Sequence, residues 1–253
     1  MVDMTADLKR KVVVLLDQAF PEYETLFTDI FGATSSALLL TCPTPGEILA
    51  VDMEKLVEII SVPSHKRFGR QKAEQIHSAA QNSFGVSFAN DAISGLIKQY
   101  MAHIRFSQQQ ISELDKKIAA LFSKFDTPIT TVPGIGPVLG AAIFSEIGDI
   151  SRFHSAAKLA AFAGIDPSVK RSGEFSGIRN HMSKRGSPYL RRTLWQASVI
   201  AALHDPALKA FFQKKRAQGK PYMNAIGHVT RKLTNIIFAV LRDDTPYYIP
   251  DLN

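Results

Sequence analysis

The sequence is poor in cysteine, in long apolar runs and, over its last third, in acidic residues. A single cysteine among 253 residues excludes an internal disulfide framework and a cysteine-rich zinc site. No run of about 18 apolar residues occurs, so no membrane-spanning helix and no membrane partner are expected. The N-terminus is amphipathic and charged, unlike a signal peptide, and the simple expectation is a cytoplasmic protein.

The scarcity of acids makes one part of the chain strongly basic. Residues 151–232 hold 16 Lys plus Arg and 3 Asp plus Glu, a balance of +13, whereas the rest holds 14 and 20, a balance of −6. Charge segregated in this way favours a nucleic-acid partner. A solvated basic face that binds nothing is the alternative.

Basic residues are densest between residues 169 and 192, where four serines and three glycines are interspersed with them and only one acid occurs. Because such a segment cannot bury an apolar face, we predict an exposed loop that runs into a helix at about Pro188. A positive loop that offers hydroxyl groups is typical of a surface that meets phosphates. The residues expected to contact nucleic acid are Lys170, Arg171, Arg179, Lys184, Arg185, Arg191 and Arg192.

Helical periodicity dominates the remainder, so an all-α fold is expected. Short amphipathic helices should fill residues 1–90, and apolar helices should surround the basic loop. The expected helices span residues 6–20, 21–32, 53–60, 71–81, 158–166, 187–205 and 223–241, with turns at 41–47 and 82–90.

The longest periodic element runs from Asp91 to about Phe125, and we treat residues 91–126 as a separate coiled-coil-like helix. Its apolar residues recur at alternating steps of four and three. Such a seam favours a two-stranded coiled coil, which would join copies of the chain into a homo-oligomer through residues 91–125. Packing of the helix within its own domain is the alternative. The seam comprises Ile93, Ile97, Tyr100, Ile104, Ser107, Ile111, Leu114, Ile118, Leu121 and Phe125.

Residues 131–148 have the pattern of a helix-hairpin-helix module. A helix should end before Pro133, a glycine turn should reverse the chain, and Pro137 should open a second helix. In such modules the backbone N–H groups of the turn contact a DNA phosphate, here those of Gly134, Ile135 and Gly136. A plain helical hairpin, whose glycines only permit close packing, is the alternative.

Several motifs in the second half stand in a familiar order. They are TVPGIG (131–136), EIGDISRF (146–153), KLAAFAGIDP (158–167), RSG (171–173), MSKRGSPYLRRTL (182–194), and Gly219-Lys220 followed by Lys232-Leu233. This combination resembles the transposases of bacterial insertion sequences of the DEDD–serine class, the bridge-RNA-guided recombinases. The resemblance implies a transposase domain over residues 127–248 and implies DNA and a structured guide RNA as partners.

The resemblance also implies that Ser172 is the nucleophile that attacks a DNA phosphodiester during strand exchange. A free serine is a weak nucleophile and needs activation, and the flanking cations could neutralise the phosphate during attack. From the residues alone, Ser176, Ser183 and Ser187 compete with Ser172 for this role, and each could instead be a turn-forming serine.

In one respect the sequence departs from the family. Family members begin with a resolvase-like α/β domain that carries three Asp and one Glu as metal ligands, and no such pattern is found here. Residues 1–90 look like the helical region that follows this domain or is inserted in it. We therefore expect no metal site or cofactor in this chain, with Mg²⁺ required only together with the acidic domain. Two interpretations remain open: a recombinase fragment that carries the catalytic serine, or a catalytically inactive helix-hairpin-helix remnant that binds nucleic acid.

Overall fold

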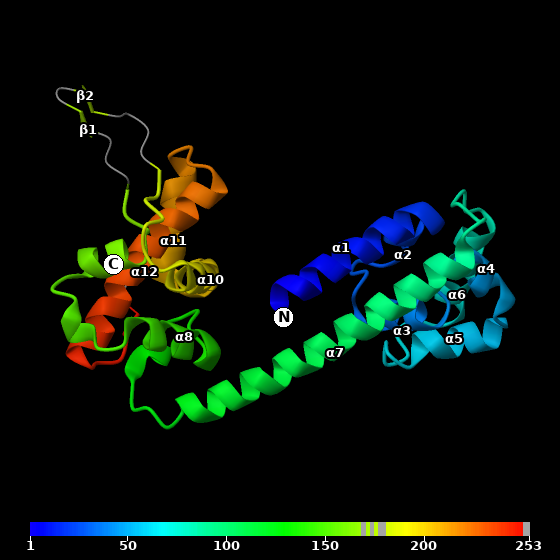
Figure 1. Cartoon of the computed structure of the whole chain (residues 1–253), viewed down its shortest axis with the longest axis horizontal. Helices are drawn as coiled ribbons and strands as arrows, with labels where there is room; N and C mark the ends of the chain where they lie inside the picture. Colours follow the sequence, from blue (N-terminus) through cyan, green and yellow to red (C-terminus); the bar gives the residue numbers. More distant parts are fainter. Residues whose placement is uncertain (168–170, 173–174, 177–180, 250–253) are drawn as a thin grey trace. The chain divides into compact units, whose positions relative to one another are not determined.

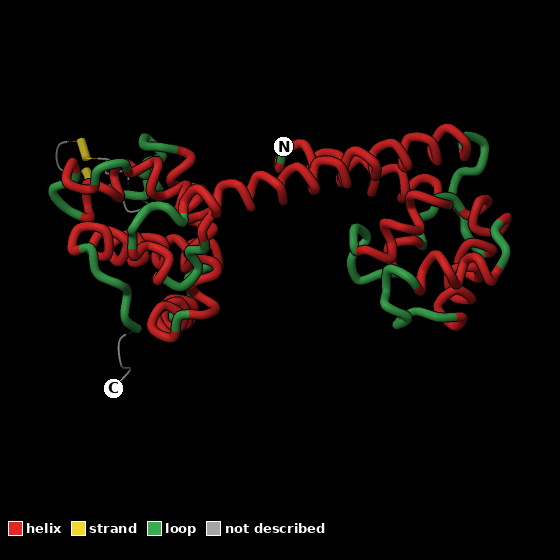
Figure 2. Tube along the Cα trace, turned by 90° about the horizontal axis from the view of Figure 1, so that it is seen from below, coloured by secondary structure: helices red, strands yellow, loops and turns green. Residues whose placement is uncertain are grey.

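The computed structural model describes residues 1–167, 171–172, 175–176 and 181–249, and for 171, 172, 175 and 176 it describes the backbone alone. Within these residues the regular secondary structure is helical apart from one pair of two-residue strands (Figures 1 and 2), which confirms the all-α fold class. No helix in this part of the chain is both long and apolar enough to cross a membrane.

The chain folds as two compact units, Met1–Leu114 and Asp115–Asn253. The boundary falls inside one continuous helix, α7 (Asn90–Phe122). Each unit has its own hydrophobic core, and each is described by itself below.

The first unit packs short helices around the N-terminal part of α7. Phe20, Tyr23 and Ile97 are fully buried at its centre. Helices were expected at 6–20, 53–60 and 71–81, and α1, α5 and α6 confirm them. The helices of this unit that precede α7 are α1 (Val2–Ala19), α2 (Tyr23–Leu26), α3 (Ala33–Thr41), α4 (Pro45–Ala50), α5 (Met53–Ser61) and α6 (Arg70–Gln81).

Two local predictions in this unit are wrong. The helix expected over residues 21–32 stops after one turn, because Phe27 is extended (φ −137°, ψ 138°) and its ring packs against those of Tyr23 and Phe68. Tertiary packing therefore overrides the helical pattern. The turn expected over residues 41–47 also ends early, because Pro45 opens α4 and Thr44 forms a capping box with Glu47.

The carboxylate of Glu47 ties α4 to α7. Its Oε1 atom accepts hydrogen bonds from the Lys98 ammonium at 2.6 Å and from the Ser94 hydroxyl at 2.8 Å. Burial alone would raise the pKa of Glu47, but these hydrogen bonds and the charge of Lys98 hold it below its usual value. The neighbouring Cys42 is buried, and burial followed by the charge of Glu47 raises its thiol pKa to about 11.

The apolar seam of α7 divides into a buried and an exposed part. Ile93, Ile97 and Ile104 are at most 8% exposed and belong to the core of the first unit, so this half packs within its own unit. Further along, Leu114 and Leu121 are 46% and 60% exposed. A coiled coil between copies stays a prediction, and the exposed half is where it applies.

The second unit has its core between α10, α12 and α8. Pro137 opens α8 and Pro188 opens α10, both as expected, and the Ser187 hydroxyl caps α10 by accepting from the Leu190 N–H. After α7 the unit contains η1 (Pro128–Thr131), α8 (Pro137–Ile147), η2 (Ile150–Arg152), α9 (Ala156–Phe162), β1 (Arg171–Ser172), β2 (Phe175–Ser176), α10 (Pro188–His204), α11 (Pro206–Ala217) and α12 (Tyr222–Asp243).

The structure differs from the sequence-based expectation at two points in this unit. The segment before the glycine turn is the 3₁₀ turn η1 and not an α-helix. The helix expected over residues 158–166 ends at Phe162, because Gly164 adopts φ +66° and turns the chain. That turn begins the segment in which the basic residues are densest.

Candidate nucleic-acid interface

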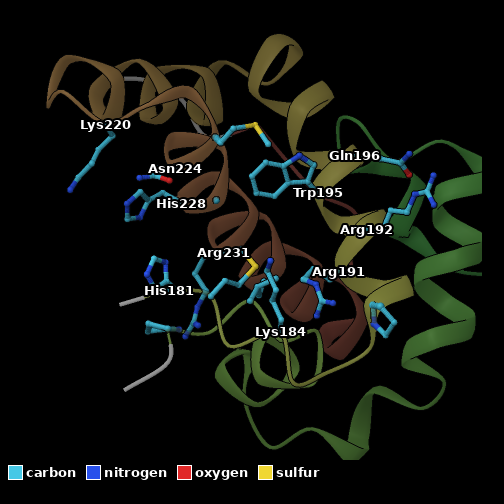
Figure 3. Close-up of a pocket in the computed structure, with 16 residues that line it drawn as sticks. His181, Lys184, Arg191, Arg192, Trp195, Gln196, Lys220, Asn224, His228 and Arg231 are labelled. Atoms are coloured by element: carbon cyan, nitrogen blue, oxygen red, sulfur yellow. The ribbon is translucent and has the colours of Figure 1, made fainter. Parts of the chain in front are cut away.

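A basic cleft of about 1570 Å³ lies in the second unit (Figure 3). Four segments form it: the chain on each side of residues 168–180, the N-terminal half of α10, and the N-terminal half of α12 together with Lys220, which lies two residues before that helix. The lining residues are Ile165, Pro167, His181, Met182, Lys184, Pro188, Arg191, Arg192, Trp195, Gln196, Lys220, Met223, Asn224, Gly227, His228 and Arg231.

Helical spacing explains why these side chains converge. On α12 the lining residues follow Lys220 at steps of three and four as far as Arg231, so they occupy one face of the helix. Residues on the opposite face, such as Val229 and Leu233, are fully buried in the core. The residues that α10 contributes recur at the same steps. The helices α10 and α12 pack together through their apolar faces, and the cleft lies between the faces that carry the lining residues.

The cleft carries a concentrated positive charge. Among the described residues that line it, five are Lys or Arg, two are His and none is acidic. Burial, and then the charges of Lys215 and Lys220, lower the pKa of His228, because a second positive charge is disfavoured there. An anionic ligand would relieve this repulsion, so the cleft suits phosphates.

Much of the predicted basic loop, residues 169–170, 173–174 and 177–180, lies outside the described residues, and an antiparallel bridge joins the chain on its two sides. Pro167 pairs with Met182 in an antiparallel bridge, and the Ser183 N–H donates to the Asp166 carbonyl at 2.8 Å. Farther along, the backbone of Ser172 pairs with that of Phe175. The candidate nucleophile therefore lies, in sequence, between the two paired segments that line one side of the cleft.

Two of the serines that compete with Ser172 have structural contacts. The Ser183 hydroxyl donates to Asp166 Oδ1 at 2.5 Å. The Ser187 hydroxyl donates to Glu146 Oε2 at 2.6 Å while it caps α10. Both pairs hold the root of the hairpin. The side chain of the third competitor, Ser176, lies outside the described atoms.

The cationic residues predicted from the sequence are distributed unevenly. Lys184, Arg191 and Arg192 line the cleft, and the Arg191 guanidinium is fixed by a hydrogen bond to the Ala163 carbonyl at 3.1 Å. Arg185 is exposed and does not line it. Lys170 and Arg179 lie outside the described residues, and so do the side chains of Arg171 and Ser172. Their contacts with nucleic acid stay predictions.

The three residues of the glycine turn lie apart from the cleft. Gly134 has φ +88°, and a Cβ there would lie 2.5 Å from the Ala197 carbonyl oxygen of α10. The close approach that this glycine permits is thus to α10. Ile135 is 3% exposed and belongs to the core. Gly136 is exposed with open space around it and Gly134 is half-buried, so Gly136 is the most accessible of the three to a partner.

Sequence reasoning missed a second group of cleft residues, namely His181, Trp195, Gln196, Lys220, Asn224, His228 and Arg231. The signal that could have found the α12 members is the polar stripe at steps of three and four beside an apolar one. Their meeting with Trp195 depends on how α10 packs on α12, which local sequence does not contain. The described part of the chain holds no cluster of three or more His, Cys, Asp or Glu side chains that could bind a metal ion.

Together the fold and the cleft define a helical protein with a concave basic surface. Residues 126–213, which include the hairpin and α10, match the Transposase IS116/IS110/IS902 family. This part of the chain is therefore similar to the transposases of that family.

Similarity to individual proteins extends beyond the matched segment. The chain is 26% identical over 251 residues to the insertion element IS110 uncharacterized 43.6 kDa protein of Streptomyces coelicolor, covering 97% of this chain and 62% of that protein. It is 30% identical over 174 residues to the insertion element IS900 uncharacterized 42 kDa protein of Mycobacterium paratuberculosis, covering 67% and 42%. It is 31% identical over 167 residues to the pilin gene-inverting protein of Moraxella bovis, covering 62% and 51%. The chain thus spans less than two thirds of the length of these relatives.

Proposed function

We propose that this chain is the DNA-binding and serine-bearing portion of a recombinase that cleaves and exchanges DNA strands in insertion-sequence transposition. The names of its relatives, which include insertion-element proteins and a pilin gene-inverting protein, support this activity. The observation that carries the proposal is the basic cleft, whose lining includes Pro167, Met182 and Lys184 from the two segments that flank the stretch containing Ser172. A strand held by the cleft would lie beside the segments that lead into and out of that stretch.

The proposed step is attack of the Ser172 hydroxyl oxygen on the phosphorus of a DNA phosphodiester. A serine–phosphorus ester forms while the bond from phosphorus to one deoxyribose oxygen breaks. The serine proton is lost, and the departing oxygen gains a proton to become a hydroxyl. The cations of the cleft and of the hairpin would stabilise the negative charge that gathers on the phosphate.

Activity would also require the acidic domain that the family resemblance implies. We propose that its carboxylates and Mg²⁺ act together with the serine, supplied by another segment or another chain. Binding of a structured guide RNA and assembly through residues 91–125 belong to the same proposal. The exposed half of the α7 seam, with Leu114 and Leu121 at its surface, supports the assembly.

The test is formation of a covalent protein–DNA adduct. The purified chain is incubated, with and without a separately expressed acidic domain and Mg²⁺, with DNA that carries a labelled phosphate at the candidate junction. We expect a labelled adduct with the wild type when the acidic domain is present and none with Ser172→Ala. A matched control, Ser123→Ala, changes an exposed serine of the same unit outside the basic segment.

Each outcome has a defined meaning. An adduct that persists in Ser172→Ala would refute the assignment of the nucleophile. Absence of any adduct, with DNA binding retained, would favour the alternative of an inactive binding remnant. DNA binding itself should weaken with salt at a log–log slope of about −0.9 per phosphate neutralised, and a flat salt response would remove the cleft from the binding surface.

A further inference from the structure

We propose that the cleft between α10 and α12 binds an unpaired strand of DNA, with a base stacked on Trp195 and phosphates on the surrounding cations. The choice of DNA rests on the proposed function. The choice of an unpaired strand rests on the chemistry of the cleft itself, and the two choices are tested separately below.

The cleft has the size of a site for several nucleotides. Its volume of about 1570 Å³ exceeds the range of roughly 300–1,000 Å³ typical of small-molecule sites. Lys220 and Arg231 both line it; Lys220 precedes the first residue of α12, Tyr222, and Arg231 follows Tyr222 by about 13 Å of helical rise. Phosphate-binding cations this far apart suit a polymer better than a single nucleotide.

Apolar surface inside the cleft distinguishes an unpaired strand from a duplex. The lining includes the Trp195 indole, the thioethers of Met182 and Met223, and the Ile165 side chain, and Figure 3 shows Trp195 between α10 and α12. A duplex presents phosphates and groove edges, and its base faces are already stacked on one another. An unpaired base has free faces, and stacking on an aromatic side chain is how single-strand-binding proteins hold it.

Polar groups complete the site for such a base. Asn224 lies on the same face of α12 as His228, and its amide offers both a donor and an acceptor to the edge of a base. A duplex uses these base edges for pairing, whereas an unpaired base leaves them available. Stacking, edge contacts and phosphate contacts are thus all supplied from residues that line one cavity.

The position of the hairpin stem explains why an unpaired strand is useful here. Pro167, Met182 and Lys184 are part of the cleft wall, so a bound strand would run beside the two segments that flank the stretch containing Ser172. Strand exchange requires that the ends to be joined leave their original duplex. A cleft that holds an unpaired strand would keep such an end close to the site of joining.

The experiment measures the binding of labelled oligothymidylate, a duplex of equal length and oligouridylate to the whole chain by fluorescence anisotropy at fixed salt. We expect oligothymidylate to bind at least tenfold tighter than the duplex and at least as tightly as oligouridylate. It should also quench the fluorescence of Trp195, the only tryptophan in the sequence. Tighter binding of the duplex would overturn the proposal, and so would clear preference for oligouridylate.

Variants test the role of stacking. Trp195→Leu should weaken oligothymidylate binding about 5- to 100-fold and duplex binding less than twofold, whereas Trp195→Phe should restore most of the affinity. Lys220→Ala should weaken binding, and Lys209→Ala, which removes an exposed cation of α11 outside the cleft, should not. Equal losses for single strand and duplex in Trp195→Leu would overturn the proposal. Selective single-strand binding without a Ser172 adduct would uphold the proposed cleft function and refute catalysis by Ser172. A Ser172 adduct without selective single-strand binding would uphold catalysis and refute the proposed cleft function.

Discussion

Replacing Gly134 by alanine should destabilise the second unit, because this glycine is pressed against α10. A Cβ at residue 134 would lie 2.5 Å from the carbonyl oxygen of Ala197 and 2.8 Å from the amide nitrogen of Ala201. Both neighbours are backbone atoms of a buried helix, so neither can move aside as a flexible side chain could. The backbone φ of +88° is also one that L side chains rarely adopt.

The magnitude follows from these two effects. A non-glycine residue in the left-handed region costs about 1–2 kcal/mol. Forcing extra volume into a packed core costs about 1–3 kcal/mol. We therefore expect Gly134→Ala to lower the free energy of unfolding of this unit by about 3 kcal/mol, which shifts its urea midpoint by roughly 1.5 M at a slope near 2 kcal/mol per M.

Trp195 lies on α10, two residues before Ala197, so its fluorescence reports the unfolding of this unit. Gly136→Ala is the matched control, because a Cβ there meets no atom within 4 Å. It should change stability by less than about 1 kcal/mol, the scale of a helix N-cap substitution. If the two variants had equal urea midpoints, the packing role of Gly134 would be refuted. A loss of DNA affinity in Gly136→Ala alone would support phosphate contact by the turn.

Three further outcomes follow from buried polar groups. The thiol of Cys42, whose pKa is raised to about 11 by burial and then by Glu47, should react with iodoacetamide at pH 8 at least a hundredfold more slowly in the folded chain than in urea; comparable rates would contradict its burial. Glu47→Gln should destabilise the first unit by about 1 kcal/mol at pH 7, because the hydrogen bond from Lys98 keeps an acceptor but loses its charge. Because the folded-state pKa of Glu47 lies below its usual value of 4.5, this difference should be complete above about pH 4.5 and shrink as the pH falls further, as measured by hydrogen exchange in α4; a difference that persists unchanged at pH 3 would argue against the carboxylate as its source. Asp205→Ala should cost about 2 kcal/mol in the second unit, since Asp205 caps α11 and also accepts the hydroxyl hydrogen of Tyr247 at 2.8 Å, and an unchanged thermal midpoint would exclude that role.

The elements that the sequence predicted well have two local signals, a periodic pattern of apolar residues and a residue that marks where the helix begins or ends. The 4-3 repeat gave α7 almost to its ends, and Pro137 and Pro188 each opened the helix expected of them. The helix expected over residues 21–32 failed because the ring of Phe27 packs against Phe68, which lies 41 positions farther along the chain. A pattern confined to one segment cannot register such a contact.

The candidate site, like the fold, was predictable from the sequence only where its signal is local. A charge count locates Lys184, Arg191 and Arg192, because basic residues cluster in sequence there. It does not locate His228 or Trp195, which reach the cleft only because α12 packs along α10. The role of Gly134 could not be decided from the sequence either. Close approach to a phosphate and close approach to a helix both require glycine, so the residue type does not distinguish them.

The two serine–carboxylate pairs at the root of the hairpin have a consequence for how this region can change. Asp166 and Ser183 hold the two strands of the stem together, and Glu146 fixes the start of α10 through Ser187. The chain between these anchors can therefore be exchanged without disturbing the core, because the entropy of closing a loop grows only slowly with its length. We therefore expect that the segment between these two anchoring hydrogen bonds can be grafted from one relative into another.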